Sequence, residues 1–287
     1  MIETAWIRHI LVGLDTSRMN AAVLHTAVRL SAFLKADITG LFVEDINLIR
    51  LAQLPFSSEV RYLTAGTRPL HQEQMQQVLH SHATWLRYEF GQTASERAIK
   101  WDFRVARGFV SQELLAAAHE ADLLVIGRLS SHRGVHQRVG STALTAVQQA
   151  ASSVLVVSPE ADFSHPIALL YDGSAAAAYA LPIALSLAQL SKQLTIYIQA
   201  QDEEEAARIQ QNLRTAVNDN DILCSYRRWL PGQNLAQLWA EQTPGMVVLG
   251  NGREGADASF ADQLLHTAPC PVLFIRPPVG GGHLHPD

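Results

Sequence analysis

A loop rich in serine, histidine and arginine joins an apolar run to an alanine-rich helical pattern. The apolar run ends at Gly127, and after twelve residues Gly140, Ser141 and Thr142 open the helical pattern. The first amides of a helix have no partner within it, and the helix dipole places positive charge there. Glycines also let the backbone approach an anion closely. The spacing therefore predicts a phosphate site at this junction.

Side chains of the same junction can assist an anion. Ser141 or Thr142 would either cap the helix or donate a hydroxyl to a phosphate oxygen. Positive charge would come from Arg128, Arg133, Arg138 and, when protonated, His132 and His136. The alternative interpretation is a loop that folding requires and that binds no ligand.

The chain repeats itself, which bears on how this loop is held. Each half opens with an apolar strand that ends in Asp-x-Ser, where Asp15 matches Asp172, and continues into a helix and a second strand. The matched segments are 9–43 with 166–199, 121–127 with 245–250, and 141–159 with 259–277. Asp15 is also expected to cap the helix that follows it, a role compatible with ligand binding, and Ser17 and Ser174 are interpreted as helix caps, not nucleophiles.

Each half alternates short, continuous apolar strands with helices, a pattern typical of strands covered on both faces. Helical crossovers impose parallel pairing, so we expect two repeated, doubly wound, five-stranded parallel α/β sheets. Ligands of such sheets lie beyond the carboxyl ends of the strands. The predicted domains are residues 1–160 with the phosphate loop, residues 161–280 with a shortened loop, and a flexible tail over 281–287.

The halves differ after their second strand, where residues 44–91 are far longer than residues 200–218. We expect a loop around Pro55 and a helix from about residue 71 to residue 90. An insert of this length would form a lid, a partner surface or simply a packing element.

Composition narrows the classes of function. The chain has 287 residues, 48% of them hydrophobic and 17% charged, which is enough for a substantial core. Its net charge of −5 includes no basic stripe, so we expect no nucleic-acid partner. No apolar run is long enough to span a membrane, and the first residues lack a signal-peptide pattern, so a cytoplasmic location is expected.

No motif for catalysis or metal binding stands out. A Gly-x-Ser-x-Gly nucleophile, a P-loop Gly-Lys-Ser/Thr and close Cys/His clustering are all missing. The two cysteines are best interpreted as small apolar side chains. We therefore predict no catalytic residue and no metal ligand.

On these motifs the sequence resembles the universal stress proteins, in the tandem form with two domains in one chain. ATP-binding members of that family carry Gly, two residues, Gly, nine residues, Gly and then Ser or Thr. The spacing falls on Gly127, Ser130, Gly140 and Ser141, with serine in place of the second glycine. Ser130 fits only with a negative φ or with strain, although its hydroxyl could donate to a phosphate.

The resemblance implies an adenine nucleotide alpha-hydrolase-like fold and contacts to ATP or ADP, with or without Mg²⁺. It places Asp15 near the nucleoside, the backbone of Val43 at the adenine, and Gly13 and Ile126 beside the base. The candidate site residues are Gly13, Asp15, Val43, Ile126, Gly127, Ser130, Arg133, Gly140, Ser141 and Thr142.

The loop of the second half departs from this pattern. Gly250 and Ser259 are nine positions apart, whereas Gly127 and Ser141 are fourteen apart. The shorter loop also carries two acidic residues, Glu254 and Asp257, that would repel phosphate. We therefore expect no nucleotide in the carboxy-terminal half.

Together these features predict a nucleotide-responsive stress regulator or scaffold. The alternatives are a ligand-free interaction protein of the same fold that acts through its surfaces, and a slow ATP hydrolase. The resemblance further implies that the last strands of the two halves meet in a pseudo-twofold arrangement. A homodimer and an unidentified protein partner are also expected.

Overall fold

The structure is a computed structural model that describes residues 7–54, 58–61, 66–69, 72–128, 139–159, 162–217, 221–230, 233–251 and 258–277. The first half contributes the strands β1 (His9–Leu14), β2 (Asp37–Asp45), β5 (Trp101–Gly108), β6 (Leu123–Gly127) and β7 (Ser153–Val157). The second half contributes β8 (Ile167–Tyr171), β9 (Gln193–Gln199), β10 (Leu223–Trp229), β11 (Met246–Gly250) and β12 (Val272–Ile275).

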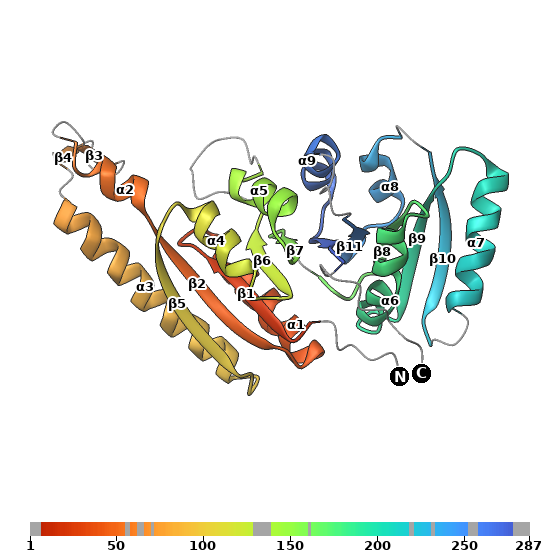
Figure 1. Ribbon diagram of the computed structural model, residues 1–287, viewed down its shortest axis with the longest axis horizontal. Helices are drawn as coiled ribbons and strands as arrows, with labels where there is room; N and C mark the ends of the chain where they lie inside the picture. The colour runs from red at the N-terminus through yellow and green to blue at the C-terminus, as the bar shows by residue number, and fades with distance from the viewer. Residues whose placement is uncertain are drawn as a thin grey trace.

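These strands form one ten-stranded sheet in the order β10-β9-β8-β11-β12-β7-β6-β1-β2-β5 (Figure 1). The order is palindromic about β7 and β12, and only that pair is antiparallel. In it Val154 faces Phe274 and Val156 faces Val272. The predicted fold of two repeated five-stranded sheets joined through their last strands is therefore confirmed.

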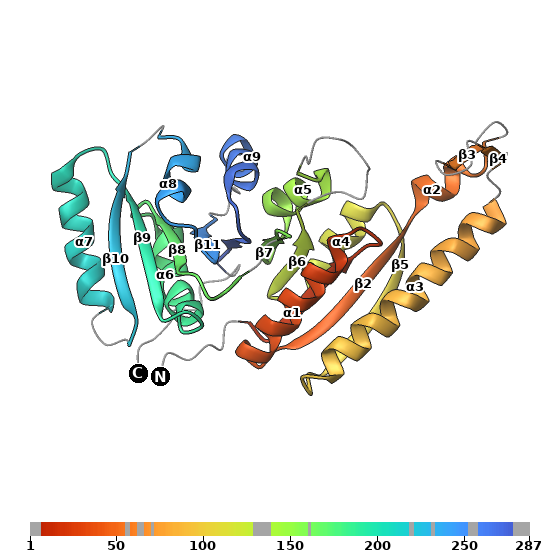
Figure 2. The same ribbon diagram turned by 180° about the vertical axis from the view of Figure 1, so that it is seen from behind.

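Helices cover both faces of the sheet (Figures 1 and 2). The helices of one face are α1 (Asn20–Leu34), α3 (Gln72–Ser95), α6 (Ala175–Ala188) and α7 (Glu203–Val217). Those of the other face are α4 (Val110–Ala118), α5 (Ser141–Gln149), α8 (Leu235–Glu241) and α9 (Ala258–Thr267). Successive strand residues point to opposite faces, so Ile10 and Val12 join the first core cluster and Leu11 joins the second.

The insert of the first half contains more structure than expected. A short helix, α2 (Ile46–Leu51), and an antiparallel hairpin of β3 (Ser58–Arg61) and β4 (Gly66–Pro69) precede α3. The Asp45 side chain accepts from the Asn47 backbone N–H at 2.8 Å and so caps α2. The predicted helix exists but continues to Ser95, and Pro55 and His71 lie outside the described residues. The insert lies at the end of the molecule farthest from the second half (Figure 1).

Candidate functional site

The carboxyl ends of β1, β2 and β6 bring predicted site residues together. Leu14 of β1 faces Phe42 of β2, and Val12 of β1 faces Val125 of β6. Gly13, Val43 and Ile126 therefore lie within one or two residues of the same level on three neighbouring strands. Pairing of β2 with β5 continues to Asp45 and Gly108, so β2 extends beyond its last pair with β1. Its backbone at Val43 lies at the edge where a base is expected.

Gly13 permits close packing of α4 on the sheet. A Cβ built on Gly13 would lie 2.9 Å from Leu114 Cδ2 and 3.0 Å from Ile126 Cγ2. Any side chain here would push Leu114 outward, away from the strand. Leu114 therefore occupies the space that a side chain at position 13 would need, and sequence reasoning missed this contact because a leucine of a helix looks like any other core residue.

Asp15 organises the turn between β1 and α1. Its Oδ1 accepts from the Ser17 backbone N–H at 3.0 Å and from the Ser17 hydroxyl at 2.6 Å. The Ser17 Oγ in turn accepts from the Met19 backbone N–H at 3.1 Å. The residue before α1 is Met19, and no side chain caps the helix, so Asp15 closes the preceding turn and the expected cap at Asp15 was wrong. The expected cap at Ser174 is confirmed, because its side chain accepts from the Ala177 N–H at 3.1 Å before α6. A contact of Asp15 with a nucleoside stays a prediction.

The ends of the predicted phosphate loop are held together. The Gly140 backbone N–H donates to the Arg128 carbonyl at 2.8 Å, and the Arg128 N–H donates to the Val157 carbonyl at 2.9 Å. Gly140 is the residue before α5 and has φ −66° and ψ 140°, which any residue can adopt. Glycine is therefore not required here for its backbone conformation.

The start of α5 provides the expected unpaired amides. The Gly140 carbonyl accepts from Ala143 at 3.0 Å and from Leu144 at 3.2 Å, so the helix begins directly after it. Ser141 and Thr142 then occupy its first turn, where backbone amides have no acceptor within the helix. Ser130 and Arg133, the other predicted phosphate contacts, lie outside the described residues.

Gly127 is explained by packing. A Cβ there would lie 3.2 Å from Met19 Cβ, at the start of α1. Its counterpart Gly250 is tighter, since a Cβ would lie 2.2 Å from the backbone carbon of Ala176 in α6. Both halves keep a glycine at this position, although only the first keeps the phosphate-loop spacing. Close approach of a helix therefore accounts for it without a ligand.

The Arg128 side chain contacts the other half of the chain. Its Nη1 donates to the carbonyls of Leu265 at 3.1 Å and Ala268 at 2.5 Å, at the end of α9 in the other half. The carbonyl end of α9 attracts this charge, and sequence alone does not show that α9 ends there. A contact of Arg128 with a phosphate stays a prediction.

Sheet register identifies the counterpart of this site in the second half. Leu14 and Phe42 form the last register pair of β1 with β2. Tyr171 and Ile198 form the last register pair of β8 with β9, so these two pairs occupy corresponding positions in the two halves. We name the first site Gly13, Val43, Ala106, Ile126 and Thr142. The second site is its counterpart, in the same order Leu170, Gln199, Trp229, Leu249 and Phe260.

The second site carries large apolar side chains where the first has small ones. Trp229 stacks on Phe260 with ring centroids 5.8 Å apart and planes 28° apart. This pair links β10 to α9. Leu170 and Trp229 are each only 5% exposed. The corresponding positions of the first half hold the smaller residues Gly13, Ala106 and Thr142.

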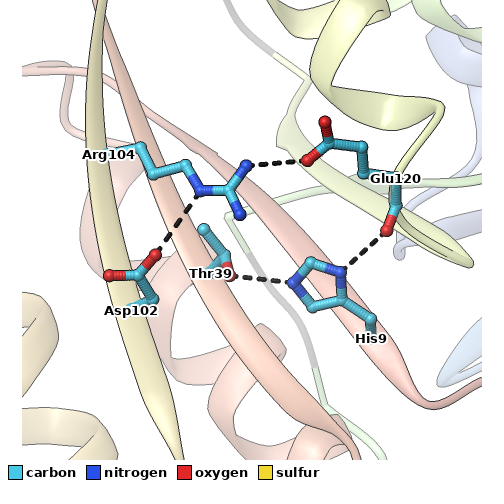
Figure 3. A network of polar contacts seen from close by, with 5 residues as sticks. All are labelled: His9, Thr39, Asp102, Arg104 and Glu120. Atoms are coloured by element: carbon cyan, nitrogen blue, oxygen red, sulfur yellow. Dashed lines mark hydrogen bonds and ion pairs between the residues drawn. The ribbon is translucent and has the colours of Figure 1, made fainter.

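A separate polar network lies at the opposite, amino edge of the sheet (Figure 3). His9 Nδ1 donates to the Glu120 carbonyl at 2.9 Å, and its Nε2 lies 2.8 Å from the Thr39 hydroxyl. Arg104 donates to the Glu120 carboxylate at 2.8 Å and to Asp102 at 3.4 Å. The Arg104 hydrogen bond lowers the pKa of Glu120. The network ties the end of α4 to three strands and lies away from the predicted site.

In the described part of the chain, no group of three or more His, Cys, Asp or Glu side chains could hold a metal ion.

Among the helices that the structure describes, none combines the length and the apolar character that a membrane crossing requires.

Comparisons with solved structures support the fold. A universal stress protein from Archaeoglobus fulgidus matches with a TM-score of 0.72 at 14% identity, covering 96% of this chain and 98% of that one. A functionally unknown protein from Pseudomonas aeruginosa PAO1 matches with a TM-score of 0.61 at 15% identity, covering 96% and 94%. A universal stress protein in complex with cAMP covers 54% of this chain and all of its own, at a TM-score of 0.40 and 17% identity.

Sequence comparisons identify the family. No curated protein matches the chain. The sequence model of the universal stress protein family matches residues 7–158, which is more than half of the chain. The chain therefore belongs to the universal stress protein family.

Proposed function

We propose that this chain is a nucleotide-responsive stress regulator or scaffold that binds ATP or ADP at the first site. In this proposal residues 1–160 form the nucleotide-binding domain and residues 161–280 form a partner domain that binds no nucleotide. Membership of the universal stress protein family supports the general role. The ligand is inferred from the site.

One observation carries the proposal: the two halves share a strand order but differ in side-chain size at the same level of the sheet. The first site has Gly13, Ala106 and Thr142 where the second has leucine and two stacked aromatic rings. The buried Trp229 and the partly buried Phe260 stack on each other, and such a pair stabilises a core and occupies volume that a planar base would need. Small residues at these positions favour a ligand in the first half only.

The residues present fit an adenine nucleotide. Val43 and Ile126 offer apolar contact for the base, and the extension of β2 offers backbone groups. Among the described contacts of Asp15, only Oδ1 is engaged, so Oδ2 would accept from a ribose hydroxyl. Backbone amides and hydroxyls of Ser141 and Thr142 would hold phosphate oxygens.

Isothermal titration of the full chain with ATP, ADP, AMP and adenosine tests the proposal. Thr142→Phe copies the second site and is expected to weaken ATP binding by about 100-fold, or roughly 2.7 kcal/mol. Gln149→Phe is the matched control, because this exposed residue lies at the other end of the same helix. Absence of heat from every nucleotide, with a folded protein, would reject the proposed ligand.

A second candidate is an interaction protein that acts through α3. Val78, Trp85 and Tyr88 recur at seven- and three-residue spacing on this helix and are 46%, 48% and 63% exposed. Such a stripe on one helix face is typical of a helix that packs against a partner. Sedimentation of the wild type and of Trp85→Glu would test pairing of two copies, since a dimer through this face would become monomeric in the variant.

A further inference from the structure

The two halves cap each other's helices. The residue after the glycine that ends β6 is Arg128, and its counterpart after β11 is Asn251. Arg128 donates to the last carbonyls of α9, and Asn251 Nδ2 donates to the Val147 carbonyl of α5 at 3.0 Å. Carbonyls at the end of a helix lack partners within it, so each half satisfies groups that the other leaves open.

Arg276 strengthens the cap on α5. Its Nη2 donates to the Val147 carbonyl at 3.1 Å and to the Gln148 carbonyl at 3.3 Å. Two side chains of the second half therefore hold α5, the helix whose first turn belongs to the first site. Helices α5 and α9 lie side by side in both views of the molecule (Figures 1 and 2).

Arg128 joins this interface to the predicted phosphate loop. Its carbonyl accepts from Gly140, its N–H donates to Val157, and its side chain reaches Leu265 and Ala268. One residue thus connects β7, the start of α5 and the end of α9. Hydrogen bonds from a charged donor are about twice as strong as neutral ones, so the side chain can fix the position of its own backbone.

We infer that Arg128 is a positioning residue through which the carboxy-terminal half sets the geometry of the first site. Two acceptors at the negative end of α9 hold the guanidinium, so it orients the backbone that pairs with Gly140. The consequence for nucleotide binding rests on the proposed function. The consequence for the hydrogen bond between the Gly140 N–H and the Arg128 carbonyl is independent of the proposed function.

Hydrogen exchange of the full chain without nucleotide tests the inference directly. Arg128→Ala is expected to accelerate exchange of the Gly140 amide by about tenfold, because the acceptor loses its anchor. Arg128→Lys should restore part of the protection, since lysine supplies charge without the planar fork. Arg104→Ala is the matched control, because this arginine binds acidic groups of its own half and should leave the Gly140 amide unchanged.

Unchanged exchange in Arg128→Ala would overturn the inference, as would a wild-type Gly140 amide with no protection at all. Titrations with ATP and adenosine then separate the two proposals. If Arg128 acts only by contacting a phosphate, Arg128→Ala weakens ATP binding but leaves exchange of the Gly140 amide in the free protein unchanged. If Arg128 positions the backbone, the substitution changes both the ATP affinity and the exchange rate. A wild type that binds no nucleotide would reject the proposed function, and the exchange result would still decide the role of Arg128.

Discussion

The two halves of the chain share one topology but carry different side chains at the same level of the sheet. In the first site Gly13 lets Leu114 pack low on the sheet, and the neighbouring positions hold the small residues Ala106 and Thr142. In the second site Trp229 and Phe260 stack across the same level. The two halves therefore differ in side-chain volume on neighbouring strands as well as in loop spacing.

Removal of the ring that fills the second site should have the largest effect. Trp229→Ala is expected to lower the free energy of unfolding by about 3–5 kcal/mol, because a buried tryptophan leaves a cavity. Urea denaturation monitored by circular dichroism measures this loss. A cost below about 1 kcal/mol would show that the stacked pair does not support the second half, and the contrast between the sites would weaken.

The two strand-ending glycines offer a matched pair of substitutions. Gly250→Ala would place a Cβ 2.2 Å from the backbone of Ala176, whereas Gly127→Ala would place it 3.2 Å from a side-chain atom of Met19. Overpacking against backbone is expected to cost about 3 kcal/mol, and the milder contact less than about 1 kcal/mol. Thermal unfolding of both variants compares them, and equal costs would contradict the packing explanation.

The aspartates that follow the first strand of each half should differ in strength. Asp15 accepts two hydrogen bonds from Ser17, whereas Asp172 accepts one from the Ser174 backbone at 2.9 Å. Asp15→Ala is expected to cost about 1–2 kcal/mol and Asp172→Ala about 0.5–1 kcal/mol. Urea titration of both variants gives the difference. A larger cost at Asp172 would refute this ranking.

The last predicted effect depends on pH and concerns the thiol beside the interface. Cys270 occupies the position of Ser152 in the first half, and burial raises its pKa from an ordinary value near 9 to about 12. Between these values the unfolded thiol ionises while the folded one stays neutral, so stability falls as pH rises through this window. The slope is at most ~1.4 kcal/mol per pH unit.

Denaturation of the wild type and of Cys270→Ala from pH 8 to pH 10.5 isolates this contribution, because every other group titrates in both. Below pH 9 the difference in the free energy of unfolding between the two proteins should be constant, and above pH 9 this difference should shrink. A constant difference over the whole range would mean that the thiol is not protected from ionisation by burial.

Much of the fold could be predicted from sequence because apolar runs and helical patterns are local signals. The strands, their parallel pairing and the meeting of β7 with β12 all followed from the repeat and the family resemblance. The hairpin of β3 and β4 was missed, since two four-residue strands carry little pattern.

The site was less accessible to sequence reasoning. The family resemblance placed Gly13, Val43 and Ile126 at one edge, but Leu114 and the stacking of Trp229 on Phe260 depend on packing between distant segments. The destination of the Arg128 side chain depends on a helix 137 residues away. The phosphate contacts expected for Ser130 and Arg133 remain predictions, because both residues lie outside the described part of the chain.

The antiparallel contact of β7 with β12 has a consequence for any attempt to divide the chain. A fragment that ends shortly after β7 would carry a buried, wholly apolar strand, from Val154 to Val157, as an open edge. Such an edge recruits another strand, and the nearest match is the same strand of a second fragment. Fusion of the repeats thus replaces a concentration-dependent association by a permanent one, and it frees each repeat to diverge without losing its neighbour.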